Sequence, residues 1–120
     1  MSAQLQVHNR FKVFSAGSFS ELSDRVRAFT ASGSVAAKSI GIEFLEGRNQ
    51  LLLSLGYATG QPGYPVALRE ATVGQLPESD EAGALGRALE KAAVGVGEVI
   101  CHELYVDADS VVHMVFMIRN

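Results

Sequence analysis

The chain has 120 residues, of which 48% are hydrophobic and 19% are charged, and its formal net charge is −3. This composition is typical of a globular domain and excludes an intrinsically disordered chain. The ten lysines and arginines are scattered along the sequence rather than gathered into a basic stripe, so we expect no direct binding of nucleic acid.

Cysteine content and hydrophobic segments bear on where the protein works. Cys101 is the single cysteine, which excludes an intramolecular disulfide and a CxxC metal or redox site. The sequence has no apolar stretch of about 18 residues and no apolar signal segment near its N-terminus. These features predict a soluble cytoplasmic protein that does not bind a membrane.

The beginning of the chain predicts a strand followed by a helix. Apolar residues alternate imperfectly over 4–14, which indicates a strand. Ser18 and Glu21 have the spacing of a capping box, in which two side chains satisfy free amides at the start of a helix. Apolar residues then recur at helical intervals, and Gly33 provides a stop. We therefore expect a helix over 18–31.

The middle of the chain predicts three more strands. Segments 38–46 and 51–57 alternate on either side of turn-forming residues, so we expect them to pair as an antiparallel hairpin. Segment 59–65 is rich in glycine and proline and is expected to be a loop. Segment 66–73 is expected to be a shorter strand at the edge of a sheet.

A second helix and a final hairpin complete the chain. Ser79 or Asp80 is expected to cap the helix, whose apolar stripe runs from Leu85 to Val96. The last segment, 99–120, is expected to form two strands. The resulting order β-α-β-β-β-α-β-β predicts one α+β domain, 1–120, with both helices on one face of a mainly antiparallel sheet. This order contains the ferredoxin-like pattern with added strands, as do several other α+β topologies.

Motifs for common chemistries are absent from the sequence. We find no phosphate-binding loop, dinucleotide-binding loop, zinc-protease helix or hydrolase elbow. Gly95-Val96-Gly97 resembles part of a dinucleotide loop, but it ends a helix and precedes a strand, the reverse of the required context. We therefore interpret it as a helix end and expect no cofactor.

The final hairpin is apolar on both of its expected faces. With a turn centred on Ala108–Asp109, Cys101 faces Phe116 and Glu103 faces Met114. Two helices on one side leave the second face uncovered, and such a patch favours an interface, so we expect a homodimer or another protein partner. The expected contact residues are Ile100, His102, Leu104, Val106, Val111, His113 and Val115.

In this register His102 and His113 share the second face, about 7–8 Å apart at the backbone. Two histidines can carry acid–base chemistry near neutral pH. They do not supply the four ligands of a zinc site, and no third ligand follows from spacing, so we expect no metal. The interpretation we favour is a pair of histidines satisfied at an interface or at its rim.

Two further pairs are candidate ligand-binding residues. Glu43 and Glu103 are acids in apolar strands and can divide acid and base roles if they lie close together. The alternative is that each faces solvent or pairs with an arginine. Tyr57 and Tyr64 flank the Gly/Pro-rich loop, where they either line a ligand site or pin the loop to the sheet edge. Cys101 is expected to act as a small hydrophobic residue of the core.

The sequence leaves two functions open. The favoured one is a small non-catalytic binding protein, acting as a homodimer or as an accessory or immunity-type partner of another protein. The alternative is a small-molecule-binding protein or enzyme with a pocket between the sheet and the 57–65 loop. No catalytic residue follows from the sequence, and the candidate ligand-binding residues are Tyr57, Tyr64, His102, His113, Glu43 and Glu103.

Overall fold

The computed structural model describes residues 10–120, so the predicted strand residues 4–9 lie outside the described part of the chain. The α+β class and the predicted order of strands and helices are confirmed. A 3-10 turn, Glu46–Arg48, joins the second and third strands. The elements are β1 (Arg10–Ala16), α1 (Phe19–Thr30), β2 (Ala36–Leu45), β3 (Gln50–Ala58), β4 (Val66–Gln75), α2 (Ala84–Ala93), β5 (Val99–Val106) and β6 (Val111–Arg119).

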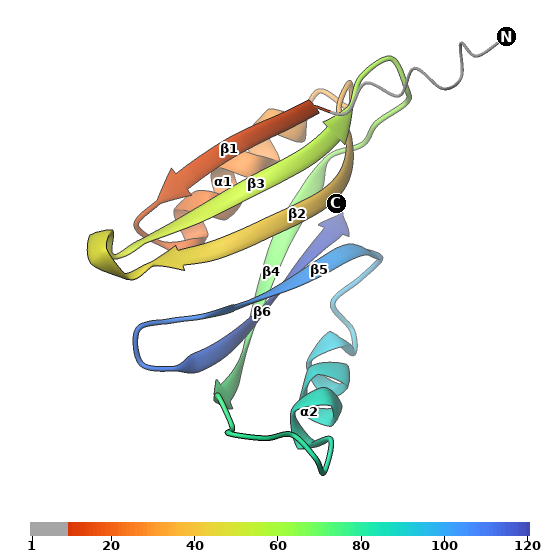
Figure 1. Cartoon of the computed structure of the whole chain (residues 1–120). Helices are drawn as coiled ribbons and strands as arrows, with labels where there is room; N and C mark the ends of the chain where they lie inside the picture. Colours follow the sequence, from red (N-terminus) through yellow and green to blue (C-terminus); the bar gives the residue numbers. More distant parts are fainter. Residues whose placement is uncertain (1–9) are drawn as a thin grey trace, which may run out of the picture.

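The strands form two antiparallel sheets, where the sequence predicted one. Sheet A has the order β1-β3-β2 and sheet B the order β4-β6-β5, and β2 lies close to β5 where the sheets meet (Figure 1). β4 is an edge strand, as predicted, but it is longer than expected. The loop that leads into β4 is tied to the end of α1, because the Gly63 amide donates to the Gly33 carbonyl at 3.0 Å. This contact turns the chain away from sheet A.

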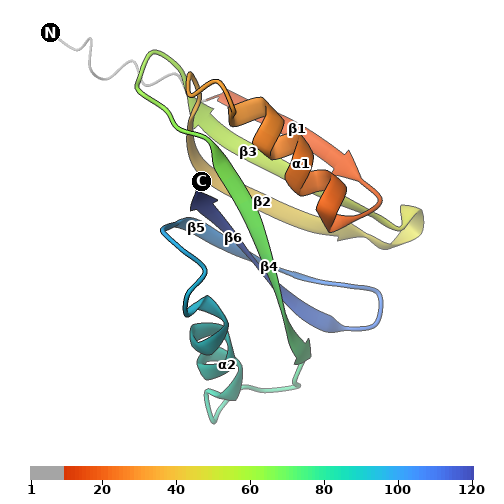
Figure 2. The same cartoon turned by 180° about the vertical axis from the view of Figure 1, so that it is seen from behind.

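Helix α1 begins where its capping signal predicts. The Ser18 hydroxyl accepts a hydrogen bond from the Glu21 amide at 3.2 Å, which satisfies one of the free amides of the first turn. Leu22 and Val26 are fully buried. Figure 2 shows α1 lying over sheet A with the start of β4 passing beside it. The helix therefore packs against both sheets at once.

The main core joins the two sheets through α1. Leu22 and Val26 pack in one cluster with side chains of β3 from sheet A and of β4 and β6 from sheet B. Two buried hydroxyl groups reinforce the junction: Ser23 donates to the Leu68 carbonyl at 3.4 Å, and Thr30 accepts from the Val66 amide at 3.0 Å. Burial of these polar groups is tolerated because both are hydrogen-bonded.

Helix α2 starts later than predicted and packs on the other face of sheet B. Its N-cap is Gly83, yet Asp80 still accepts hydrogen bonds from the amides of Leu85 and Gly86 at 2.8 and 3.4 Å. Its apolar stripe contacts a second, smaller cluster in sheet B, so the two helices do not share a face. The buried sheet B residues of this smaller cluster are Ala67, Met114, Phe116 and Ile118.

Neither helix of the described chain is long and apolar enough to cross a membrane.

Candidate functional site

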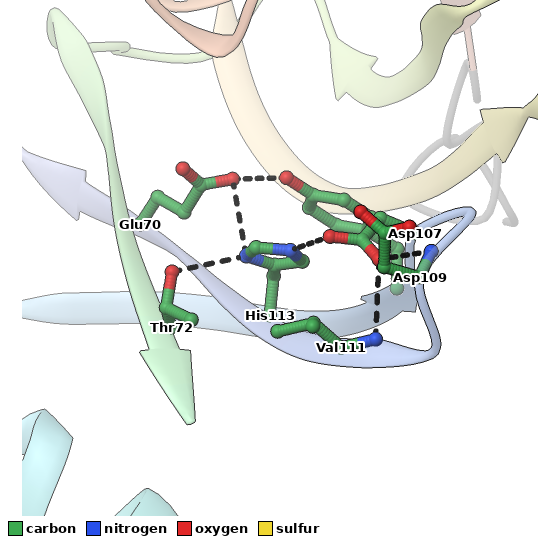
Figure 3. A network of polar contacts seen from close by, with 7 residues as sticks. Glu70, Thr72, Asp107, Asp109, Val111 and His113 are labelled. Carbon is green, nitrogen blue, oxygen red and sulfur yellow. Dashed lines mark hydrogen bonds and ion pairs between the residues drawn. The ribbon is translucent and has the colours of Figure 1, made fainter. Parts of the chain in front are cut away.

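A polar network lies at the end of sheet B where β4, β5 and β6 meet the β5–β6 turn (Figure 3). Two cross-strand pairs build it, because Thr72 of β4 and Tyr105 of β5 both pair with His113 of β6. Paired residues of an antiparallel sheet project from the same face. The three side chains therefore converge although they are far apart in the sequence.

The register of the β5–β6 hairpin differs by one residue from the predicted one. The last pair of the ladder is Val106 with Val112, and Cys101 pairs with Met117 rather than with Phe116. The predicted tight turn was wrong because the Asp107 carboxylate accepts backbone hydrogen bonds across the turn and holds open a longer loop. A slip of one residue moves the side chains of one strand to the other face relative to its partner.

The observed register separates the two histidines. His113 faces the polar network, whereas His102 pairs with Phe116 on the face that carries α2. The predicted histidine pair is therefore wrong, and the seven expected contact residues do not form one face. They divide into His102, Leu104 and Val106 on the α2 side, Val111, His113 and Val115 on the other side, and Ile100 in a β-bulge.

His113 is the centre of the network. Its Nε2 lies 2.7 Å from Oδ2 of Asp107, and its Nδ1 lies 3.2 Å from the Thr72 hydroxyl and 4.0 Å from Oε2 of Glu70. Figure 3 shows Glu70 and Thr72 on one side of the imidazole and Asp107 on the other. The ring also stacks on Tyr105, with 4.7 Å between centroids and 16° between planes. Contacts on both nitrogens and on one ring face fix the orientation of the imidazole.

Asp107 holds the turn and the imidazole together. Its Oδ1 accepts from the amides of Asp109 and Val111 at 2.8 and 3.1 Å, while its Oδ2 accepts from His113. The hydrogen bond to His113, followed by the one from the Val111 amide, holds the pKa of Asp107 below its ordinary value. Hydrogen bonds to the charged form of a carboxyl group favour ionisation. Asp107 is therefore a carboxylate at neutral pH.

Tyr105 is a hydrogen-bond donor in this site. Its hydroxyl donates to Oε2 of Glu70, and the ring is buried. Burial first, and then the Glu70 hydrogen bond, raise the pKa of Tyr105 well above its ordinary value. The phenol thus stays protonated at neutral pH and does not serve as a base.

A small pocket of about 230 Å³ opens beside the network. One wall carries polar network side chains, including His113 and Glu70, and the opposite wall is apolar, formed by Phe19, Phe44 and Leu51. The apolar wall comes from the start of α1 and from the β2–β3 hairpin, so the pocket lies between the two sheets. A mixed wall of this kind suits a small ligand with one apolar end and one polar end.

Tyr57 and Tyr64 lie elsewhere, in packing contacts. Tyr57 contacts Phe29 edge to face, with 5.2 Å between ring centroids. Tyr64 packs against the main core, and the guanidinium of Arg119 lies 4.3 Å from its ring centroid. Both arrangements favour the interpretation that these tyrosines pin the loop. A ligand role for them stays a prediction.

The remaining candidate residues do not join the network. Glu43 is exposed and pairs with Leu52 on sheet A, on the face turned away from α1, whereas Glu103 pairs with Val115 on sheet B. Cys101 packs against the main core, as expected for a small hydrophobic residue, and burial raises the pKa of its thiol. Among residues 10–120, no three His, Cys, Asp or Glu side chains are grouped to hold a metal ion.

His113 was a candidate from the sequence, but none of its partners was. Tyr105 and Asp107 meet it only in the observed register, which depends on the side chain of Asp107 itself. Glu70 and Thr72 did leave a detectable signal, because their spacing of two residues puts two polar side chains on one face of a strand.

Apolar side chains remain exposed on the outer face of sheet B. α2 packs against β4 and leaves the β5 side open, where Val99, Leu104 and Val106 are 40, 39 and 39% exposed. A groove of about 400 Å³ separates α2 from this side. We name the open strand and the groove the β5–α2 surface. It comprises Leu89, Glu90, Ala93, Val99, His102, Leu104 and Val106.

Comparison with known proteins adds no functional information to this geometry. A scan against protein-family models, a search of curated proteins and a search of solved structures each returned no match.

Proposed function

We propose that the chain is a small binding protein that associates with a second copy of itself through the β5–α2 surface. The observation that supports this proposal is the exposure of Val99, Leu104 and Val106 along β5, on the sheet face that also carries α2, a helix with no buried residue of its own. Large apolar side chains gathered in one place are typical of an interaction surface.

A second copy suits this surface because a two-fold contact uses the same residues on both sides. In such a contact unlike residues meet reciprocally. The groove contains one acid, Glu90, and one imidazole, His102, which can face each other across the axis. Apolar side chains in the centre with a charged pair beside them are common in protein interfaces.

The half-buried single thiol suits a reducing compartment, and on this ground we assign the protein to the cytoplasm. The alternative is that the same surface binds a different protein, as expected of an accessory or immunity-type partner. The oligomeric state of the purified chain distinguishes the two kinds of binding protein.

Sedimentation velocity at micromolar concentration and pH 7 tests the proposal. We expect a dimer for the native chain and a shift to monomer for Val106→Glu, because the substitution puts an unpaired charge into an apolar contact. Val13→Glu is the matched control: Val13 is a 60% exposed valine on sheet A, and its replacement is expected to leave the dimer intact.

Two results contradict this proposal. A native chain that stays monomeric across the micromolar range excludes self-association at physiological concentrations. A dimer that Val13→Glu dissociates and Val106→Glu does not would move the contact from the β5–α2 surface to sheet A.

A further inference from the structure

The polar network contains a hydroxyl group, an imidazole and a carboxylate joined in a chain of hydrogen bonds. We propose that Thr72 is an activated nucleophile that accepts an acyl group from a small ester, with His113 as its general base and Asp107 as a positioning residue. This activity goes beyond self-association and uses the opposite face of sheet B.

The proposal rests on the order of the hydrogen bonds that join Asp107, His113 and Thr72. Oδ2 of Asp107 is 2.7 Å from Nε2 of His113, and a carboxylate can only accept, so Nε2 carries the proton. In the neutral imidazole this leaves Nδ1 with a free lone pair. Nδ1 is 3.2 Å from Oγ1 of Thr72, whose hydroxyl then donates to it. A nucleophile, a base and a group that orients the base are the three parts of an activated hydroxyl site.

The hydrogen-bonded side chains of His113 and Asp107 are held in place, while the Thr72 hydroxyl at the end of the series is exposed. The imidazole stacks on Tyr105, and its side chain is only 13% exposed. Asp107 is fixed in turn by the two backbone amides that donate to its Oδ1. Thr72 is exposed, so a reagent can reach its hydroxyl. An orienting group of this kind prevents the base from turning away from the nucleophile.

The charged groups that face His113 favour proton transfer to it. Asp107 contacts Nε2 from the turn, and Glu70 of β4 places Oε2 4.0 Å from Nδ1. Both carboxylates stabilise the imidazolium that forms when Thr72 loses its proton. Tyr105, the titratable neighbour on β5, donates to Glu70 and remains protonated, so it does not compete as a base.

The neighbouring pocket indicates the class of acyl donor. His113 lines the 230 Å³ pocket, whose far wall is formed by Phe19, Phe44 and Leu51. Thr72 is not among the lining residues, but its hydroxyl is hydrogen-bonded to His113, which is. An ester whose short apolar acyl chain lies against that wall would therefore place its carbonyl group toward Nδ1 of His113 and Oγ1 of Thr72. The volume is small for a ligand site, which favours a short-chain ester.

The proposed step balances without any further reactant. Oγ1 of Thr72 attacks the ester carbonyl carbon, and its proton passes to Nδ1 of His113. The bond between that carbon and the leaving oxygen then breaks, and the leaving oxygen takes the proton from His113. The products are an acyl ester on Thr72 and a free alcohol, with the imidazole neutral again.

p-Nitrophenyl acetate is the probe that tests this chemistry. The released nitrophenolate is followed by absorbance, and tandem mass spectrometry of a digest locates the acetyl group. We expect acetylation of Thr72 in the native chain and in Thr72→Ser, and none at this position in Thr72→Val. His113→Gln is expected to slow acetylation by about 100-fold or more, as for loss of a general base. Thr59→Val, at an exposed threonine of the loop before β4, is the control and should react like the native chain.

Three outcomes overturn the proposal: no acetyl group on Thr72, an unchanged rate in His113→Gln, or equal labelling of Thr59 and Thr72. Valine has nearly the shape of threonine and serine keeps the hydroxyl, so the Thr72 variants decide the question even where His113→Gln does not fold. Melting temperatures measured alongside show whether each variant is folded.

Discussion

Asp107 belongs both to the β5–β6 turn and to the polar network around His113. Its carboxylate accepts two backbone amides and the imidazole of His113, and these hydrogen bonds lower its pKa. A carboxyl group whose pKa is lower in the folded state stabilises the fold above its ordinary pKa. That stability is lost as the pH falls toward the lowered value and the carboxylate is protonated.

We therefore expect Asp107→Asn to reduce the free energy of unfolding at pH 7, with a difference from the native chain that shrinks as the pH falls below the ordinary value of 3.8. Urea unfolding at a series of pH values measures this difference. Asp109→Asn, an exposed position of the same turn, serves as the control and should have little effect. A difference that is constant with pH would show that the ionised carboxylate is not what holds the turn.

Single residues were predictable where their partners are close in sequence. The Ser18 cap follows from a spacing of three residues, and Asp80 binds amides of α2 although the helix starts beyond it. The contacts of His113 with Thr72 and Tyr105 were not predictable, because they depend on two strand registers. One of these registers is fixed by hydrogen bonds of a single side chain in the turn, which no periodicity reveals.

At the scale of elements, α1 is attached to β4 by a side-chain hydrogen bond. Thr30 is fully buried, and its hydroxyl accepts from the Val66 amide at 3.0 Å and donates to the Val26 carbonyl at 3.1 Å. Thr30→Val keeps the shape of the side chain but leaves the buried Val66 amide without its acceptor. We expect a loss of about 1–3 kcal/mol.

Chemical denaturation measures this loss, and hydrogen exchange locates it, because the Val66 amide should lose protection. Thr59→Val removes an exposed hydroxyl from the loop between β3 and β4, and its effect should stay within about 0.5 kcal/mol. Equal stabilities of the native chain and Thr30→Val would mean that α1 is held to β4 by apolar packing alone.

Local patterns predicted most elements but not their division between two sheets. The strand β1, the helix α1 and the β2–β3 hairpin follow from alternation, capping and turn residues. The division depends on the loop before β4, where Gly63 passes so close to Val35 that a Cβ would lie 2.1 Å from the Val35 carbonyl oxygen. The sequence shows a Gly/Pro-rich loop there, but not which backbone it approaches.

For the whole molecule, the sequence predicted more apolar sheet surface than two helices can cover. The exposed residues of β5 agree with this expectation in part, and Phe11 and Val13 on sheet A are a further exposed pair, 70 and 60% accessible. Seven residues between Ile100 and Val115 were assigned to one interface face on a register that the structure corrects. Hydrophobic balance therefore predicted that apolar residues stay exposed, whereas the faces on which they lie depend on the strand register.

The expectation of one domain can be tested through the core that both sheets share. Leu22 of α1 is fully buried in the cluster that includes Leu53 of sheet A and Val115 of sheet B. Leu22→Ala leaves a cavity between the sheets and should cost about 2–5 kcal/mol. If the sheets unfold together, native-state hydrogen exchange will show the same loss of protection for the amides of Leu53 and Val115. Val94→Ala, at an 80% exposed position, is the control. Loss of protection in sheet A alone would divide the chain into two independent units.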